Sequence, residues 1–469
     1  MSRPFFATRI RGTVALRSAV VAILACSSGS AFASGFALLE QSASRVGTAF
    51  AGTAAAADDA TTIFYNPAGM GALKQSEVAF VVTGIDVGSK FKNDGSIAAI
   101  GQPLGVNGGD AGGWNVLPSA YWAMPLNDRF AVGFAVNAPF GLRLEYDNDW
   151  IGRFQAVKSE IETYNFNPAF SWRLSNVVTL GFGVDYQKLQ AELTNYVNYS
   201  AAVAQGAAQL VQAGLLPASQ LPAVIAASGN LSGLARVRGD DSQWGYNAGV
   251  LFELPSRTTI GLSYRSALDY KVEGSATFAP PTATNPVVST ILAGAGQTTL
   301  ANGRASVDLK LPDSAILSLE QSFGNDFEVL ADVAWTGWST VHELRVVRDS
   351  GVTLSLTPEH WKDTWRYALG GVYKLNDAWK LRAGVAYDEA PVPDSTRTAR
   401  LPDADRKWVA LGAQWSVTPQ MVIDAGYAHL FSNDSRISQD AGSVLANGLL
   451  AGKQETSVNI VSVQASYKW

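Results

Sequence analysis

Apolar and polar residues alternate along most of this chain, from about residue 77 to its end. In the segment 179–186, Leu180, Phe182 and Val184 share one side of an extended chain, and small or polar residues share the other. A period of two is typical of half-buried β-strands. The pattern predicts strands at 76–91, 114–124, 130–137, 159–173, 177–199, 240–254, 257–277, 304–322, 327–341, 363–375, 378–388, 405–417, 421–432 and 456–469.

The connections between these strands alternate between short and long. The short ones consist largely of turn-forming residues such as Asn, Asp, Gly and Pro. The long ones are 92–113, 138–158, 200–239, 278–303, 342–362, 389–404 and 433–455. Short turns at one end and long loops at the other are typical of an outer-membrane barrel. The sequence therefore predicts an all-β fold, a transmembrane antiparallel β-barrel of about 14 strands over residues 76–469, wide enough to enclose a lumen.

Tryptophans near the predicted strand ends support this fold, because aromatic side chains gather at the two membrane interfaces of a barrel. The tryptophans expected there are Trp114, Trp122, Trp172, Trp335, Trp338, Trp365, Trp408 and Trp415. The chain ends in a further aromatic residue, Trp469, which resembles the signal read by the barrel assembly machinery. The loop 200–239 is rich in Ala, Gln and Leu, so we expect external helices there, interrupted at Pro217 and Pro222.

Composition narrows the possible classes. Hydrophobic residues make up 47% of the 469 residues, but the mean hydropathy of +0.06 is too low for a helical membrane protein. Charged residues make up only 16%, below the roughly 25% of soluble domains. Acidic residues outnumber basic ones, 40 to 35, and no basic stripe is present, so nucleic acid is not an expected partner.

The N-terminus carries the pattern of a secretory signal. Four arginines precede or flank the short apolar run 19–25, and Ala31-Phe32-Ala33 forms an A-x-A cleavage site. We expect residues 1–33 to be removed, leaving Ser34 first in a mature chain without cysteine. Two alternatives remain: an uncleaved anchor, for which the apolar run is short, and a lipoprotein signal cleaved before Cys26.

Residues 34–75 precede the first predicted strand and are rich in Ala, Gly, Ser and Thr. An open lumen would leak, and small residues suit a segment packed inside a tube. This segment is therefore predicted to be a hatch, or plug, that ends in an Asn-Pro-Ala turn before the first strand. A disordered leader is the alternative, but the segment has many apolar residues for that. The residues predicted to belong to the hatch site are Phe36, Asn66, Pro67 and Ala68.

A proline interrupts the third predicted strand. Pro139 cannot donate a ladder hydrogen bond, and proline is tolerated in a sheet at bulges, edges or interruptions. The run Asn137, Ala138, Pro139, Phe140 and Gly141 is therefore interpreted as a break that opens the wall sideways. The alternative is that Pro139 begins the following loop.

A hydrophobic substrate with a carboxylate would need a cation near the upper lumen to orient it. The candidate carboxylate-binding residues are Arg143, Arg153, Lys188 and Arg265, although each of them could equally be a solvated or structural residue.

Several motifs together resemble one family. SGFALLEQSASRVGTAFAG, followed by ADDATTIFYNPAGM, looks like the N-terminal hatch of the FadL/TodX family of outer-membrane hydrophobe transporters. The similarity extends in order over the mature chain, through the segments 137–141, 150–153, 167–169, 311–314, 335–338 and 402–406.

This resemblance implies a fourteen-stranded barrel with a luminal hatch in the bacterial outer membrane. It also implies passive uptake of long-chain fatty acids or other hydrophobic molecules, with lateral release through the wall and no cofactor. Members that bind fatty acids have basic residues near the end of the fifth strand, where this chain has Gln190 and Glu192, with only Lys188 nearby. Uptake of aromatic hydrocarbons therefore stays open as an alternative. The expected partners are the transported molecule, outer-membrane lipid, lipopolysaccharide and the assembly machinery, and the expected state is a monomer.

Two other functional classes are weighed against this one. A hydrolase would need a nucleophile and a base, usually histidine, but the only histidines are His342, His360 and His429, and the sequence shows no metal cluster or phosphate loop. We therefore predict no enzymatic activity and no metal site. A general porin for polar solutes would lack a plug.

Overall fold

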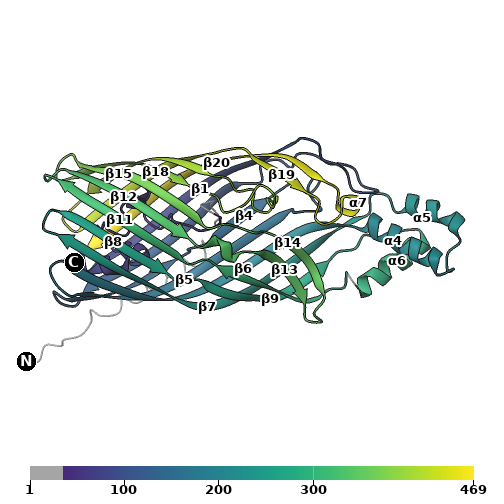
Figure 1. The fold of residues 1–469 in the computed structure, drawn as a ribbon, viewed down its shortest axis with the longest axis horizontal. Coiled ribbons are helices and arrows are strands. Elements are labelled where there is room, and N and C mark those ends of the chain that lie inside the picture. The colour runs from purple at the N-terminus through teal and green to yellow at the C-terminus, as the bar shows by residue number, and fades with distance from the viewer. Residues whose placement is uncertain (1–34, 299) are drawn as a thin grey trace, which may run out of the picture.

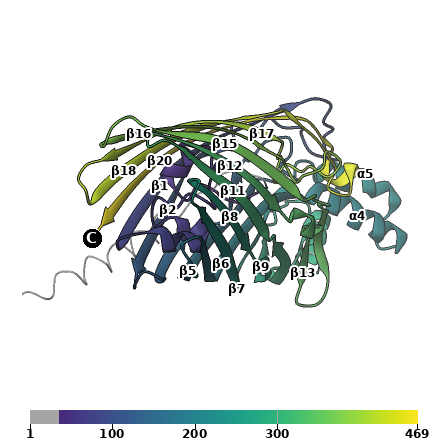
Figure 2. The ribbon, with the colours of Figure 1, turned by 60° about the vertical axis from the view of Figure 1, so that its left-hand side comes forward.

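The computed structural model of the protein describes residues 35–298 and 300–469, so the predicted signal peptide lies outside the described residues. Fourteen strands form a closed antiparallel wall, as predicted (Figures 1 and 2). The first strand, β1 (Glu77–Asn93), closes it by pairing with the last, β20 (Leu450–Lys468). Between them the wall runs through β2 (Gly113–Pro125), β3 (Phe130–Asn137), β5 (Lys158–Arg173), β6 (Val178–Asn198), β7 (Ser232–Leu254), β8 (Thr258–Arg265), β11 (Ser314–Phe323), β12 (Phe327–Thr336), β15 (Thr364–Lys374), β16 (Trp379–Asp388), β17 (Arg406–Ser416) and β18 (Met421–Ser432).

The two faces of the wall differ as the alternation predicts. On β17, the outward side chains of Val409 and Leu411 are 48% and 60% exposed, whereas the inward side chain of Trp408 is 1% exposed. Trp379 and Trp415 stack beside a short turn, with ring centroids 5.8 Å apart. The prediction was wrong for Trp338 and Trp408, which are buried rather than in a girdle. Trp408 occupies an inward position of its strand, and Trp338 lies beyond the end of the alternating segment.

Additional strands continue the wall at the end that carries the long loops. They are β4 (Gly141–Glu145), β9 (Leu268–Phe278), β10 (Gly303–Leu311), β13 (Glu343–Arg348), β14 (Thr353–Pro358) and β19 (Ser435–Gln439). The predicted strands 257–277 and 304–322 are each two strands, broken at 266–267 and at 312–313. Pro312 at the second break has no N–H to donate. The predicted strand 327–341 ends at Thr336, and the 3₁₀ turn η3 (Trp338–Thr340) follows.

Helices cluster beyond these strands, at the right of Figure 1. The predicted helical loop contains α4 (Tyr199–Gln212), the 3₁₀ turn η2 (Ala218–Gln220) and α5 (Leu221–Ala227), and the unpredicted helix α6 (Pro286–Gln297) packs against them. Another short helix, α7 (Val444–Asn447), lies in the last long loop. The chain is broken before Pro217, as predicted. Pro222 does not interrupt a helix, because it lies in the first turn of α5, where proline is tolerated. None of the described helices is long and apolar enough to cross a membrane.

The N-terminal segment lies inside the wall, near the end with the short turns (purple in Figures 1 and 2). It contains α2 (Ala43–Val46), α3 (Thr62–Tyr65) and the 3₁₀ turn η1 (Pro67–Ala72). Its backbone touches wall glycines on several sides: an added Cβ would lie 2.0 Å from Ala68 N at Gly181, 1.9 Å from Ala54 O at Gly261 and 2.1 Å from Thr48 O at Gly384. Side chains would not fit at these three contacts.

Polar side chains of the wall hold the same segment in place. The carboxylate of Asp332 on β12 accepts hydrogen bonds from Gly52 N at 2.7 Å and Thr53 N at 3.2 Å. The amide of Asn66 donates to Ala54 O at 2.6 Å and to Val250 O of β7 at 3.2 Å. The segment is therefore bonded to two separate strands of the wall, β7 and β12.

Candidate functional site

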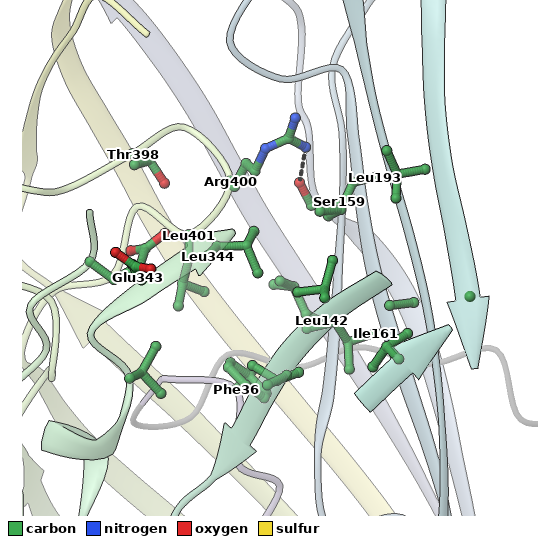
Figure 3. A pocket seen from close by; sticks show the side chains of 18 of the residues that line it. Phe36, Leu142, Ser159, Ile161, Leu193, Glu343, Leu344, Thr398, Arg400 and Leu401 are labelled. Carbon is green, nitrogen blue, oxygen red and sulfur yellow. Dashed lines mark hydrogen bonds between the residues drawn. The ribbon is translucent and has the colours of Figure 1, made fainter. Parts of the chain in front are cut away.

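An apolar cavity, here called the upper cavity, lies beneath the external loops (Figure 3). Its volume is about 100 Å³. Apolar side chains come from β4 to β6, from β7, β9 and β10, and from the loops around β13 and β17. They include Leu142, Ile161, Leu193, Val237, Val272, Val307, Leu344, Trp361 and Leu401. A cavity of about 150 Å³ holds a benzene ring, so the observed form is too small for a long aliphatic chain.

Arg400 brings a positive charge to this apolar cavity. Its guanidinium donates to Ser159 Oγ at 3.2 Å, to Lys158 O at 3.3 Å and to Asn195 Oδ1 at 3.3 Å, all of them neutral oxygen atoms. Burial lowers the pKa of Arg400 to about 10, which still leaves it charged at neutral pH. The cavity therefore offers a cation that donates hydrogen bonds to neutral oxygen atoms.

Glu359 lines the same cavity, and its carboxylate, when ionised, has the opposite charge to Arg400. Burial raises the pKa of Glu359 to about 7, against the effects of a hydrogen bond from Trp361 Nε1 at 2.9 Å and of the charge of Arg400. Because this pKa lies near neutral pH, small changes in pH decide whether Glu359 adds a negative charge to the cavity.

Four aromatic rings separate the upper cavity from a second one below. Phe36 packs edge to face against Trp338, Trp361 and Phe140, with ring centroids 5.0, 5.9 and 5.9 Å apart. Phe36 and Trp361 line the upper cavity, and Phe140 lines the second. We call these four rings the aromatic partition.

The second cavity, here called the lower cavity, has a volume of about 90 Å³. It lies between the N-terminal segment and the wall, and Pro139 is among its lining residues. The others include Leu38, Leu39, Phe64, Tyr65, Phe140, Arg265, Trp335, Arg366 and Asp388. A molecule that passed the aromatic partition would therefore arrive beside Pro139.

The wall is interrupted beside this cavity. β3 pairs with β5 up to Asn137, and pairing with β5 resumes at Gly141 as β4. Pro139 thus lies in an interruption within the wall and not at the start of a loop. On the other side, β2 pairs with β3 only as far as Ala120, and no pairing joins β2 to β4 in the part of the chain that the structure describes. A stretch of wall between β2 and β4 therefore lacks ladder hydrogen bonds.

The start of the N-terminal segment covers this interruption from inside. Leu38 N donates to Pro139 O at 2.7 Å, and Gly141 N donates to Phe36 O at 2.9 Å. Gln41 Nε2 adds a bond to Ala138 O at 2.8 Å. We call residues 35–41 the arm. The arm both fills the gap in the wall and supplies Phe36 to the aromatic partition.

The four cations proposed from the sequence lie at different places. Arg265 lines the lower cavity, where it pairs with Asp185 Oδ1 at 2.7 Å and donates to Phe64 O at 2.9 Å. Arg153 is buried beside the upper loops and donates to carbonyl oxygens, Pro103 O at 2.7 Å among them. Burial lowers the pKa of Arg153.

Arg143 and Lys188 do not line the lumen, contrary to the sequence-based expectation. Both occupy outward positions of their strands, where Arg143 lies 3.7 Å from Glu160 and Lys188 lies 3.2 Å from Asp240. Sequence reasoning missed Arg400 because it lies in a long loop whose path no local pattern determines. The one signal in the sequence was that Arg400 lies two residues before 402–406, one of the segments that resemble the family.

The histidines form no catalytic arrangement with one another. His429 Nδ1 lies 2.8 Å from Asn459 Oδ1 on the wall, while the backbone of His360 bonds to that of His342 in the loop before β15. Within the described ranges, no group of three or more His, Cys, Asp or Glu side chains is placed to hold a metal ion.

Comparison with known proteins gives this geometry a context. Residues 24–469 match the family model described as outer membrane protein transport protein (OMPP1/FadL/TodX). The chain is 28% identical to a long-chain fatty acid transport protein of Escherichia coli, over 92% of this chain and 94% of the relative. It is 30% identical to outer membrane protein P1 of Haemophilus influenzae, over 88% of this chain and 89% of the relative.

Solved structures agree with the fold. A FadL homologue of Pseudomonas aeruginosa is 28% identical and superimposes with a TM-score of 0.81, covering 92% of this chain and 99% of the other. The toluene transporter TodX of Pseudomonas putida shares the fold with a TM-score of 0.61 at 18% identity, over 87% of this chain and 94% of the other. The family is one of transport proteins and not of enzymes. The chain belongs to the OMPP1/FadL/TodX family of outer-membrane transport proteins.

Proposed function

We propose that this protein carries hydrophobic carboxylates, above all long-chain fatty acids, across the outer membrane by passive diffusion. The observation that supports this most directly is Arg400, a cation bonded to neutral oxygens at the edge of a mostly apolar cavity. Related proteins with similar sequences are named long-chain fatty acid transport proteins. A hydrocarbon would gain nothing from that charge, so aromatic hydrocarbon uptake is the second candidate, and a general porin the third.

In the proposed route, the substrate first meets the apolar helices α4 to α6 outside the barrel and then enters the upper cavity with its carboxylate toward Arg400. The cavity is too small for a long chain while the arm is in place, so entry requires Phe36 to move. Displacement of Phe36 opens the aromatic partition and withdraws the arm from Pro139 together, because one short segment does both. The substrate then leaves sideways between β2 and β4 into the membrane.

Residues 34–75 act as the hatch in this proposal. They fill the lumen that fourteen strands enclose, so small polar solutes do not leak while the substrate takes the side exit. Cleavage after Ala33, insertion by the barrel assembly machinery, contact with lipopolysaccharide and a monomeric state belong to the same proposal.

Replacing Arg400 with glutamine should weaken palmitate binding by about 10- to 100-fold, the value of a hydrogen bond to a charged group. Binding of 1-hexadecanol, which has no charge, should stay within a factor of two or so of wild type. Tryptophan fluorescence titration of detergent-solubilised protein measures both. Lys188→Gln is the matched control, because Lys188 is paired with Asp240 on the outer face. Equal palmitate affinity in wild type and R400Q would place carboxylate recognition elsewhere.

The pH dependence of binding should reveal Glu359. Above the pKa of about 7 its carboxylate is ionised and repels an anionic ligand near Arg400, and below it the repulsion is absent. Affinity for hexadecanesulfonate, whose charge does not titrate, should therefore fall about tenfold from pH 5.5 to pH 8.5. A tenfold fall corresponds to a change of about one pKa unit at Glu359 when the anion binds. Glu359→Gln should remove this fall. Glu343→Gln should not, since a hydrogen bond from Arg345 holds the pKa of Glu343 below its usual value. A pH profile in E359Q as steep as in wild type would contradict the assignment.

A further inference from the structure

The wall has a second interruption, at the level of the upper cavity. β10 pairs with β13 only over its first part, which ends at Val307, whereas it pairs with β9 along its whole length. In the part of the chain that the structure describes, no backbone hydrogen bond joins residues 308–311 to residues 338–345. Pro312 follows and has no N–H to donate, and pairing on this side resumes at Ser314, between β11 and β12. We call the unpaired stretch between 308–311 and 338–345 the side gap.

A polar pocket of about 430 Å³, here called the outer pocket, lies on the outer side of the side gap. Its charged or titratable lining residues are Asp269, Lys271, Asp308, Lys310, His342 and Glu343. Lys310 pairs with Asp269 of the neighbouring β9 at 3.4 Å, and Glu343 pairs with Arg345 of its own strand at 2.7 Å. These ion pairs form along the two edges of the side gap and do not bridge it.

A single layer of side chains separates the outer pocket from the upper cavity. Leu309, Val341 and Glu343 line both of them, and Glu343 is labelled at the border of the cavity in Figure 3. At this place the upper cavity is closed sideways by side chains and not by a backbone ladder. Side chains change rotamer far faster than paired strands separate, so this layer is the part of the surrounding wall that opens most easily.

Aromatic side chains place the side gap at the membrane interface. Directly below it, Asp313 accepts a hydrogen bond from Tyr264 Oη at 2.9 Å and another from Gly337 N at 3.0 Å. The ring of Trp335 lies beside Gly337, and Trp335 pairs in register with Trp365, which is 44% exposed. Aromatic residues of membrane barrels gather at the level of the lipid head groups. The outer pocket therefore opens where the head group of a membrane-dissolved amphiphile lies.

We propose that the side gap is a second entrance to the upper cavity, used by single-chain acidic amphiphiles that are already dissolved in the outer leaflet. The head group stays in the polar outer pocket while the tail passes between Leu309 and Val341, so that no charge has to cross the apolar layer first. The interruption beside Pro139 lies on the other side of the aromatic partition, so one opening admits the substrate and the other releases it. The entrance rests on the proposed function for its substrate, but its place in the wall does not depend on that substrate.

Cross-linking across the side gap tests this entrance in proteoliposomes. Lys310 and Glu343 lie on its two edges, and the chain has a single cysteine, Cys26, in the predicted signal peptide. The variant Lys310→Cys, Glu343→Cys is linked with a short bismaleimide, and mass spectrometry of its tryptic peptides verifies the link. The two ion pairs that the variant loses are exposed, and such pairs contribute little to stability.

A photoactivatable fatty acid with a diazirine on its tail, dissolved in the bilayer, reports entry into the cavity. Linking the side gap should lower the labelling of Leu193 and Trp361, which line the upper cavity, about tenfold, because packed atoms then exclude the tail. Labelling of the outward residue Leu411 should stay the same. Arg304→Cys, Asp349→Cys is the matched control, because these side chains lie 3.2 Å apart and join β10 to the hairpin of β13 and β14 where the wall is already paired. Its link should leave the labelling of the cavity unchanged.

The variant Leu309→Ala tests the same entrance without a cross-link. It thins the layer between the outer pocket and the upper cavity, so labelling of Leu193 and Trp361 should rise at least about twofold. Unchanged labelling in the linked protein, or equal labelling of L309A and wild type, would overturn the proposal. A wild type that takes up no oleate, although its cavity is labelled from the bilayer and the link prevents this, would count against the proposed function only.

Discussion

Deletion of residues 34–66 is expected to turn a nearly non-conducting protein into one that forms large, steady channels in planar bilayers. The wall would still close, because β1 and β20 pair over their full length without the deleted residues. The lumen, however, would lose the buried segment that contacts wall strands on several sides, and a barrel of this size leaves a water-filled interior when nothing fills it. Conductance should rise by at least an order of magnitude or so.

Heat-modifiable migration on a gel would verify that the deletion variant inserts and folds. Deletion of α6 provides a matched control, since that helix lies outside the barrel and its loss should leave conductance near the wild-type value. If the 34–66 deletion conducts no better than wild type, the segment does not plug the lumen, and the hatch assignment fails.

The double variant Pro139→Val, Gly141→Leu is expected to bind oleate but to take it up at about one tenth of the wild-type rate or less. Valine restores an N–H that can join the ladder, and leucine places bulk in the interruption between β2 and β4. The upper cavity contains neither residue, so binding there should persist. Uptake into lipid-loaded proteoliposomes, measured beside a binding titration, separates the two effects.

Pro168→Val is the control for the loss of a strand proline. Pro168 lies in β5, where the pairing with β6 skips two residues, but the chain continues as a strand. This substitution should leave uptake unchanged. A double variant that inserts, binds and still transports at the wild-type rate would mean that substrate leaves by another route, such as through the hatch toward the periplasm.

The wall could be predicted from sequence because each strand repeats a simple rule. Leu180, Phe182 and Val184 face lipid and their neighbours face the lumen, so a period of two identified nine of the fourteen wall strands within two residues of both ends. The rule failed where the wall rises beyond the membrane. There, Pro312 separates β10 from β11, although the alternation of the sequence continues across the break. Above the membrane both faces of the wall meet water, so hydrophobicity no longer distinguishes the inner face from the outer one.

The site could be predicted only in part. Pro139 is visible as a proline in an alternating strand, and the structure places an interruption there. The aromatic partition is not visible, because Phe36, Phe140, Trp338 and Trp361 come from four segments that only the closed wall brings together. Arg400 was missed for the same reason, whereas Arg143 and Lys188 were chosen for being near the right strands although their side chains face outward.

The bonds between the N-terminal segment and distant parts of the chain also have a consequence for the order in which the molecule folds. Gly35 finds Asp403 only across 368 residues, and Thr53 finds Asp332 across 279. Synthesis makes the N-terminal segment first, but Asp332 and Asp403 are made much later. Contacts this distant in sequence form slowly, since a long loop must close before they contribute. The N-terminal segment therefore becomes fully ordered only after these later residues are in place, and until then it must be protected from aggregation.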